Sequence, residues 1–269
     1  MESPFSTFFV VHFEVGGNTK NLKYQDRFWP ATVDLIKLAD RYDAKLTLQF
    51  TPQWAEYILN DRYKFNLFKG WQRHGHEAGL HHHGYDHSDW DGYTNRRGKE
   101  NNSSYRGNVT DMLNTVNELI RPYQILTGTI TDEAHDYPDG IKYDTQGIKI
   151  RHSRTRPKNV TLNGKNVIQT GMSILSDAGN IKELKKEYHK SADNEIFGVI
   201  THEIDFANSP EIVEEWFGFV KSRGDRIQTV SEIISNYRKG YNIECCDKPL
   251  TFSKDVTGSK VLFGKWLSI

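Results

Sequence analysis

Histidines are concentrated in one short stretch of this chain, and their side chains could bind a metal ion. Between Gly75 and His87 the sequence reads Gly-His-Glu-Ala-Gly-Leu-His-His-His-Gly-Tyr-Asp-His, which holds five of the eleven histidines. Imidazole is the commonest side-chain ligand for zinc and similar ions. The stretch therefore predicts a metal site. A solvated histidine-rich loop, or an adventitious metal site, is the alternative interpretation.

The spacing of these histidines indicates which of them act together. Residues 80–83 are typical of the end of a strand that Gly84 breaks, and alternate side chains of a strand share a face. His81 and His83 are therefore expected on one face and His82 on the other. His87 follows His83 by four residues, a spacing that returns two imidazoles to one side of a turn or of a first helical turn.

Two further groups stand where apolar strands are predicted to end. Residues 7–13 form an apolar run that ends in His12-Phe13-Glu14, and residues 196–200 form another that ends in Thr201-His202-Glu203. We interpret Glu14 and His202 as functional groups. The alternatives are a cap or salt-bridge partner for Glu14 and a packed strand-end histidine for His202.

Predicted strands and helices alternate through most of the chain, which favours a parallel α/β architecture. The carboxyl ends of such strands form the active-site face of a β/α barrel or the crevice of an open sheet. No Gly-X-Gly-X-X-Gly follows the first strand, and the barrel is favoured. We predict strands over residues 7–13, 44–50, 77–83, 125–130, 148–151 and 196–200, a hairpin over 160–169, helices over 25–42, 104–120, 181–189 and 210–223, a helix starting at 52 after a Thr51 cap, and a strand with a helix over 227–237.

Composition excludes several classes of partner. The 269 residues carry a formal net charge of zero, so no basic excess indicates nucleic acid. The N-terminus lacks the features of a signal peptide, and no apolar run approaches the ~20 residues that span a bilayer. These features favour a cytoplasmic protein without a membrane partner. Adjacent Cys245 and Cys246 rarely close on each other, so no disulfide framework is expected.

Aromatic residues are frequent near the histidine cluster. Their rings could form a wall on which a sugar stacks, or they could close the core, and both interpretations stay open. The residues concerned are Trp71, Tyr85, Trp90 and Tyr93.

Four segments together resemble the polysaccharide deacetylase superfamily, which includes chitin and peptidoglycan deacetylases. The histidine stretch ending in His83-Gly-Tyr-Asp-His87 is similar to its metal motif. Weaker similarities follow in order at Gly140-Ile-Lys-Tyr-Asp-Thr, Gly198-Val-Ile-Thr-His202 and Gly224-Asp-Arg-Ile-Gln-Thr-Val-Ser-Glu-Ile. The resemblance covers about residues 7–236. It implies an irregular parallel β/α barrel of about seven strands over residues 1–240, to which we add a C-terminal β-rich extension over 241–269.

The chain departs from the family pattern at the first strand. That strand usually ends in Phe-Asp-Asp-Gly, where one Asp is the base and the next binds the metal, whereas this chain has Phe13-Glu14-Val15-Gly16. Either His81 replaces the missing ligand, beside His83 and His87, or Glu14 is itself the ligand. Thr131-Asp-Glu-Ala-His135 stands in place of another family motif, so Asp132, Glu133 and His135 are candidates for contact with metal or substrate.

The implied chemistry is hydrolysis of an amide by water that a divalent ion, expected to be zinc, activates. Glu14 would accept the proton and His202 would protonate the leaving amine, with Asp205 orienting His202 or bonding the backbone. The expected substrate is an N-acetylated sugar or polysaccharide. The alternatives are a hydrolase of a small cyclic amide and a non-catalytic relative that binds carbohydrate or metal, which the loss of the second Asp makes credible.

Overall fold

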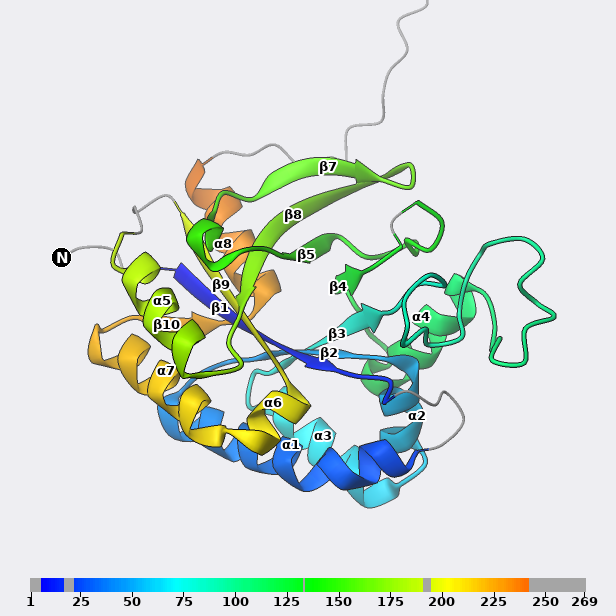
Figure 1. The fold of residues 1–269 in the computed structure, drawn as a ribbon, viewed down its shortest axis with the longest axis horizontal. Coiled ribbons are helices and arrows are strands. Elements are labelled where there is room, and N and C mark those ends of the chain that lie inside the picture. Colours follow the sequence, from blue (N-terminus) through cyan, green and yellow to red (C-terminus); the bar gives the residue numbers. More distant parts are fainter. Residues whose placement is uncertain (1–5, 17–21, 133, 191–194, 242–269) are drawn as a thin grey trace, which may run out of the picture.

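Seven parallel strands close into a barrel (Figure 1). The computed structural model describes residues 6–16, 22–132, 134–190 and 195–241. The strands follow the order β1 (Ser6–Phe13), β2 (Thr47–Phe50), β3 (Glu77–His82), β4 (Thr127–Ile130), β5 (Tyr143–Gly147), β8 (Lys165–Ile174) and β9 (Ile196–His202). β9 pairs with β1 along seven residues and closes the ring, which confirms the predicted β/α barrel.

Three short strands extend the sheet outside the ring. β10 (Arg226–Gln228) pairs parallel with the start of β1, and β6 (Arg154–Thr155) pairs antiparallel with β9. β7 (Lys158–Leu162) forms a hairpin with β8. Its turn is at Asn163 and Gly164, both with positive φ (46° and 73°), a conformation that favours these two residue types, and the predicted hairpin is confirmed.

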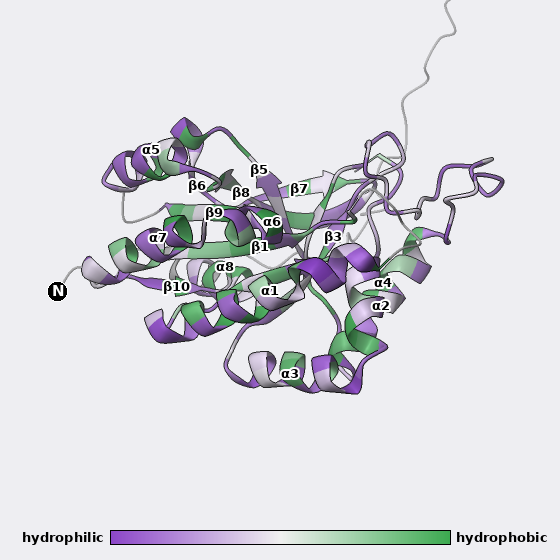
Figure 2. Cartoon of the chain, turned by 60° about the horizontal axis from the view of Figure 1, so that its bottom comes forward, coloured by the Kyte–Doolittle hydropathy of each residue, from purple (hydrophilic) through white to green (hydrophobic). Residues whose placement is uncertain are grey.

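Helices pack around the barrel, and each alternates hydrophobic and hydrophilic residues (Figure 2). They are α1 (Lys23–Tyr42), α2 (Pro52–Leu59), α3 (Arg62–Arg73), α4 (Val109–Asn117), α5 (Ala178–Tyr188), α6 (Glu203–Asn208), α7 (Pro210–Ser222) and α8 (Val230–Tyr241). No helix within the described ranges is both long and apolar enough to cross a membrane.

Side-chain alternation along β1 connects the core to the candidate site. Phe9 and Val11 face outward into the large core shared with the helices, whereas Phe8 and Val10 belong to a second core inside the barrel. The inward series continues with His12. The strand that fills the barrel with apolar side chains therefore delivers polar groups to its carboxyl end.

Three local predictions differ from the structure. β5 ends at Gly147, and residues 150–152 form a 3₁₀ helix rather than the predicted strand over 148–151. β5 reads Tyr-Asp-Thr-Gln-Gly, and its polar residues bond inside the barrel, so it lacks the apolar run by which buried strands are recognised. α3 was not predicted, and the Thr51 hydroxyl does not cap α2. The C-terminal extension and both cysteines lie outside the described residues.

Candidate metal centre

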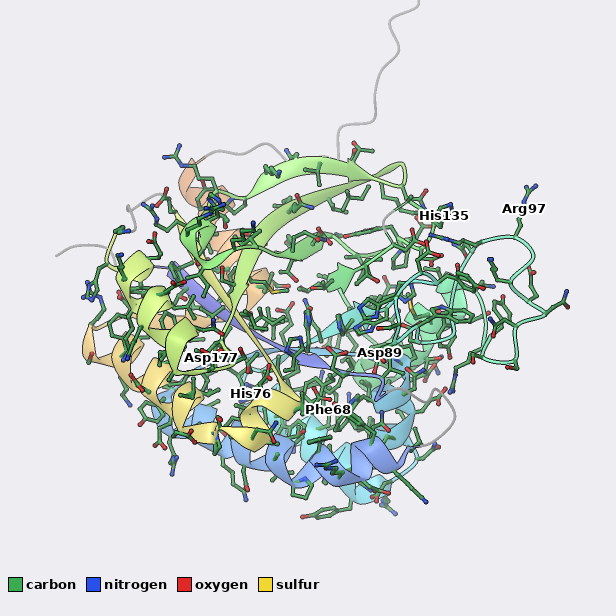
Figure 3. The ribbon with its side chains drawn as sticks, viewed as in Figure 1. Phe68, His76, Asp89, Arg97, His135 and Asp177 are labelled. Atoms are coloured by element: carbon green, nitrogen blue, oxygen red, sulfur yellow. The ribbon has the colours of Figure 1, made fainter. Side chains whose placement is uncertain are left out.

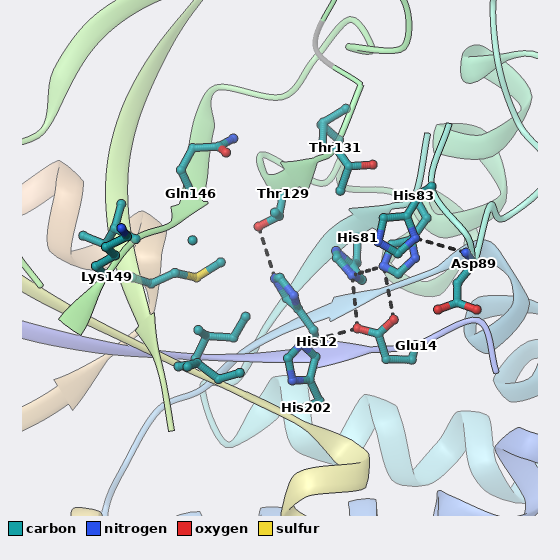
Figure 4. Close-up of a pocket in the computed structure, with 17 residues that line it drawn as sticks. His12, Glu14, His81, His83, Asp89, Thr129, Thr131, Gln146, Lys149 and His202 are labelled. Atoms are coloured by element: carbon teal, nitrogen blue, oxygen red, sulfur yellow. Dashed lines mark hydrogen bonds and ion pairs between the residues drawn. The ribbon is translucent and has the colours of Figure 1, made fainter. Parts of the chain in front are cut away.

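Strands β1, β3 and β9 bring five ionisable side chains together at the carboxyl end of the barrel. His12 is on β1 and Glu14 directly follows that strand, His81 and His83 lie at the end of β3, and His202 is the last residue of β9. All five line a cavity of about 820 Å³ (Figure 4). β1 and β9 are neighbours because the barrel is closed, so residues 188 positions apart share one site.

The Glu14 carboxylate lies at the centre of this group. Its Oε2 is 3.1 Å from His83 Nε2, and its Oε1 is 3.4 Å from His81 Nε2 and 3.5 Å from His202 Nε2. Burial raises the pKa of Glu14, but hydrogen bonds and charge interactions with His81 and His83 outweigh it and hold the pKa far below its usual range. Glu14 is therefore ionised at neutral pH.

His81 and His83 point their Nε2 atoms at each other across 2.7 Å. Burial and the neighbouring His83 lower the pKa of His81 to about 4, so its imidazole is neutral at pH 7 and can offer a lone pair. Two lone pairs can face each other at this distance only with a proton or a cation between them. Neighbouring ligands of one tetrahedral zinc ion lie about 3.3 Å apart. The nitrogen and carboxylate donors of this cluster therefore fit a divalent ion.

His87 lies on the other side of His83. The two ring centres are 4.2 Å apart, and the backbone N–H of Asp89 donates to His87 Nδ1 at 3.1 Å, which leaves Nε2 available. His83, His87 and Asp89 offer donor atoms within 4.8 Å of one another. Burial lowers the pKa of His87. The sequence did not identify Asp89, which lies near the end of the barrel in Figure 3.

His12 was also missed as a member of the site. Its ring stacks on His81 with centres 3.8 Å apart, and its Nε2 bonds Gln49 Oε1 at 2.9 Å and Thr129 Oγ1 at 3.2 Å. Gln49 and Thr129 hold the His12 ring, and stacking on that ring fixes the plane of the His81 ring. The signal was present, because His12 precedes Glu14 by two residues and strand alternation puts both on the inner side.

His202 ends β9, Glu203 begins α6, and both contact Glu14. His202 Nδ1 bonds Asp205 Oδ2 at 2.8 Å, which is one of the two arrangements that the sequence left open for Asp205. Burial lowers the pKa of His202, but Asp205 and the charge of Glu14 outweigh it and raise the pKa overall. Glu203 is fully buried, its Oε1 accepts the backbone N–H of Glu14 at 2.9 Å, and burial raises its pKa to about 8.

His82 faces away from the cluster, between two fully buried carboxylates. Its Nδ1 is 2.7 Å from Asp91 Oδ2 and its Nε2 is 3.4 Å from Asp136 Oδ2. Burial lowers the pKa of His82, but the two carboxylates outweigh burial and raise it to about 9. Asp91 Oδ2 also accepts the backbone N–H of His83 at 3.2 Å. This ionic group ties the loops after β3 and β4 to the strand that carries His81 and His83.

The remaining candidates lie outside the cavity. Asp132 pairs with Arg96 (Oδ2 to Nη2, 2.7 Å) and with His135 (Oδ1 to Nδ1, 3.1 Å), and Figure 3 shows His135 at the edge of the molecule. The Asp132 carboxylate is turned toward Arg96, in the loop between β3 and α4, rather than toward Glu14. Glu133 lies outside the described residues.

The expected aromatic wall is absent from the cavity. Trp71 packs against Trp29 and Phe68 in the outer core, and none of the four aromatic residues named above lines the cavity. These rings close the core or cover the loop after β3. None of these four rings is therefore available to stack on a sugar bound inside this cavity.

No family model and no curated protein matches this chain. Solved structures do match. Puue allantoinase aligns with 89% of this chain and 92% of its own, with a TM-score of 0.62 at 12% identity. A putative polysaccharide deacetylase from Mycobacterium smegmatis aligns with 93% and 96%, with a TM-score of 0.57 at 11% identity. The chain has the polysaccharide deacetylase fold. A 4-alpha-glucanotransferase from Thermococcus litoralis aligns over 87% of this chain but only 40% of its own (TM-score 0.56, 10% identity). At such low identity, these matches show the fold alone.

Proposed function

We propose that this protein is a metal-dependent hydrolase of carbon–nitrogen bonds that removes the acyl group from an N-acylated substrate. An N-acetylated sugar is the first substrate to test, because the sequence resembles the deacetylases. The observation that carries the proposal is the convergence of Glu14, His81, His83 and His202 in one cavity at the carboxyl end of the barrel.

The imidazoles of His81, His83 and His87 would hold the ion, and this nitrogen-rich set suits zinc. When bound, a divalent ion acts as a Lewis acid toward a carbonyl oxygen and lowers the pKa of water. The buried imidazole of His81 suits this role, because it is neutral at pH 7 and need lose no proton to bind a cation.

Glu14 is assigned as the base. Its backbone N–H donates to Glu203 and its carbonyl accepts from Trp54 Nε1 at 3.0 Å, so the chain on both sides of its side chain is fixed. An ionised carboxylate in this position can take a proton from water as the water attacks the carbonyl carbon.

His202 is assigned as the acid. Asp205 bonds Nδ1 and thereby directs Nε2 toward the cluster, where Nε2 can give a proton to the departing nitrogen. The raised pKa of His202 keeps more of the protonated form at neutral pH. Glu14 and His202, the proposed base and acid, lie at the ends of neighbouring strands because the barrel closes between β1 and β9.

Amine release from N-acetylglucosamine oligomers tests the proposal with zinc-loaded protein, with chelator-treated protein and with Glu14→Gln. Turnover is expected only in the zinc-loaded wild type, with a loss of roughly 10²–10⁴-fold in Glu14→Gln. The metal content of Glu14→Gln decides the role of Glu14. Loss of a base leaves the ion bound, whereas loss of a ligand releases it. Ring opening of a cyclic amide without deacetylation would favour the alternative hydrolase. Binding of the substrate without turnover of any amide would contradict the proposal that the protein is an enzyme.

A further inference from the structure

The cavity has a second side, opposite the metal centre, that is aliphatic. In the ring of strands, β5 and β8 stand across the barrel from β2 and β3. Figure 4 shows Gln146, on β5, and Lys149, just after β5, on the far side from His83 and Asp89. The hydrocarbon side chains that line the cavity from this part of the barrel, here called the aliphatic wall, are Ile148, Met172, Ile174 and Ile200.

The deeper part of the aliphatic wall belongs to the core inside the barrel. Met172 and Ile200 pack with Phe8 and Val10 in that core and are 0% and 6% exposed. Ile174 follows Met172 by two residues on β8, so both point to the same side of the strand. Ile174 is 39% exposed, although it is a large hydrophobic residue that lines the cavity. Hydrocarbon left open at a cavity mouth is typical of a surface that a ligand covers.

This wall suits a hydrocarbon chain better than a sugar ring. A pyranose carries hydroxyl groups around its edge, and a hydroxyl that loses water without gaining a hydrogen bond costs about 1–3 kcal/mol. The aliphatic side chains offer such groups no hydrogen-bond partner, and the polar groups on this side of the cavity come from Gln146 and Lys149. The described residues that line the cavity also include no Phe, Tyr or Trp on which a sugar face could stack.

We propose that the aliphatic wall is an acyl-chain subsite, so that the substrate is an amide of an aliphatic acid several carbons longer than acetate. This rests on the hydrolase function proposed above. When the substrate carbonyl lies beside Glu14 and His83, His202 is on the side of the leaving nitrogen. The side chain of His202 is 24% exposed, which gives the amine a way out. The acyl chain then extends from Met172 toward Ile174.

A series of N-acyl glucosamines with acetyl, butanoyl and hexanoyl groups tests the subsite in the zinc-loaded wild type. We expect kcat/KM to rise about fourfold for each methylene group that the wall covers. The ratio of hexanoyl to acetyl rates should fall in Ile174→Ser, which removes hydrocarbon, and persist in Ile174→Val, which keeps it. Tyr63→Ser, at an exposed hydrophobic residue on α3, serves as the control and should leave the ratio unchanged.

Two outcomes separate this inference from the function on which it rests. Hydrolysis of the acetyl amide with no gain for longer chains would overturn the subsite and leave the hydrolase intact. If no amide is hydrolysed, titration calorimetry with sodium acetate and sodium hexanoate decides. Tighter binding of hexanoate, reduced in Ile174→Ser, would keep the subsite while the hydrolase fails, and equal affinities would overturn the subsite as well.

Discussion

His82 is expected to stabilise the native protein through its positive charge. Between Asp91 and Asp136 its pKa is about 9, against 6.5 for an unperturbed histidine. The difference of 2.5 units corresponds to about 3 kcal/mol of unfolding free energy. Because the folded-state pKa is raised, this contribution is complete below pH 6.5 and is lost as pH rises to 9.

The measurement is urea unfolding of the metal-free protein, wild type and His82→Gln, at pH 6, 7, 8 and 9.5. Gln removes the charge and keeps a polar side chain. Changes in packing therefore lower the unfolding free energy of the variant by the same amount at every pH, whereas the loss of the charge lowers it by an amount that shrinks as pH rises. The destabilisation should decrease by about 3 kcal/mol between pH 6 and 9.5. His74→Gln is the matched control, since His74 pairs with Asp40 at the surface with 62% of its side chain exposed. A His82→Gln offset that is constant with pH would refute a charged His82.

Four other outcomes are expected. His83→Ala combined with His87→Ala should abolish tight binding of a divalent ion, measured by elemental analysis. His81→Ala should also lower metal affinity, measured by titration calorimetry, if it replaces the ligand that Val15 lacks. Turnover should decline as pH rises above the raised pKa of His202, because the acid loses its proton. In the metal-free protein, Glu203→Gln should increase stability more at pH 8 than at pH 5, since the wild type must ionise a buried carboxyl whose pKa is about 8.

The architecture and the core of the site could be predicted from local patterns. Alternation of apolar strands with amphipathic helices indicated the barrel, and the two-residue period of β3 separated His81 and His83 from His82. Glu14 and His202 were found because a charge that ends an apolar strand is conspicuous. All of these signals depend on neighbours in the sequence.

The parts that were missed depend on contacts between distant segments. Asp91 and Asp136 are ordinary loop acids in the sequence, and only the return of two loops onto β3 makes them partners of His82. β5 was not predicted because its polar residues bond to one another within the barrel. Asp89 could not be identified from the sequence, because only the folding of its loop brings it beside His83 and His87.

His81 and His82 show how alternation gives two identical neighbours opposite chemistry. His81 faces other imidazoles, and its pKa is lowered to about 4, so this residue destabilises the native state by about 3 kcal/mol as pH falls from 6.5 to 4. His82 faces two carboxylates, and its pKa is raised to about 9. At pH 7 the first is therefore a neutral base with a free lone pair, and the second is a cation that anchors the surrounding loops. A shift of register by one residue would exchange these environments, so that His82 alone, rather than the pair His81 and His83, would face the cavity. The register of β3 thus decides that two imidazoles face the cavity, while the third pairs with the loop acids Asp91 and Asp136.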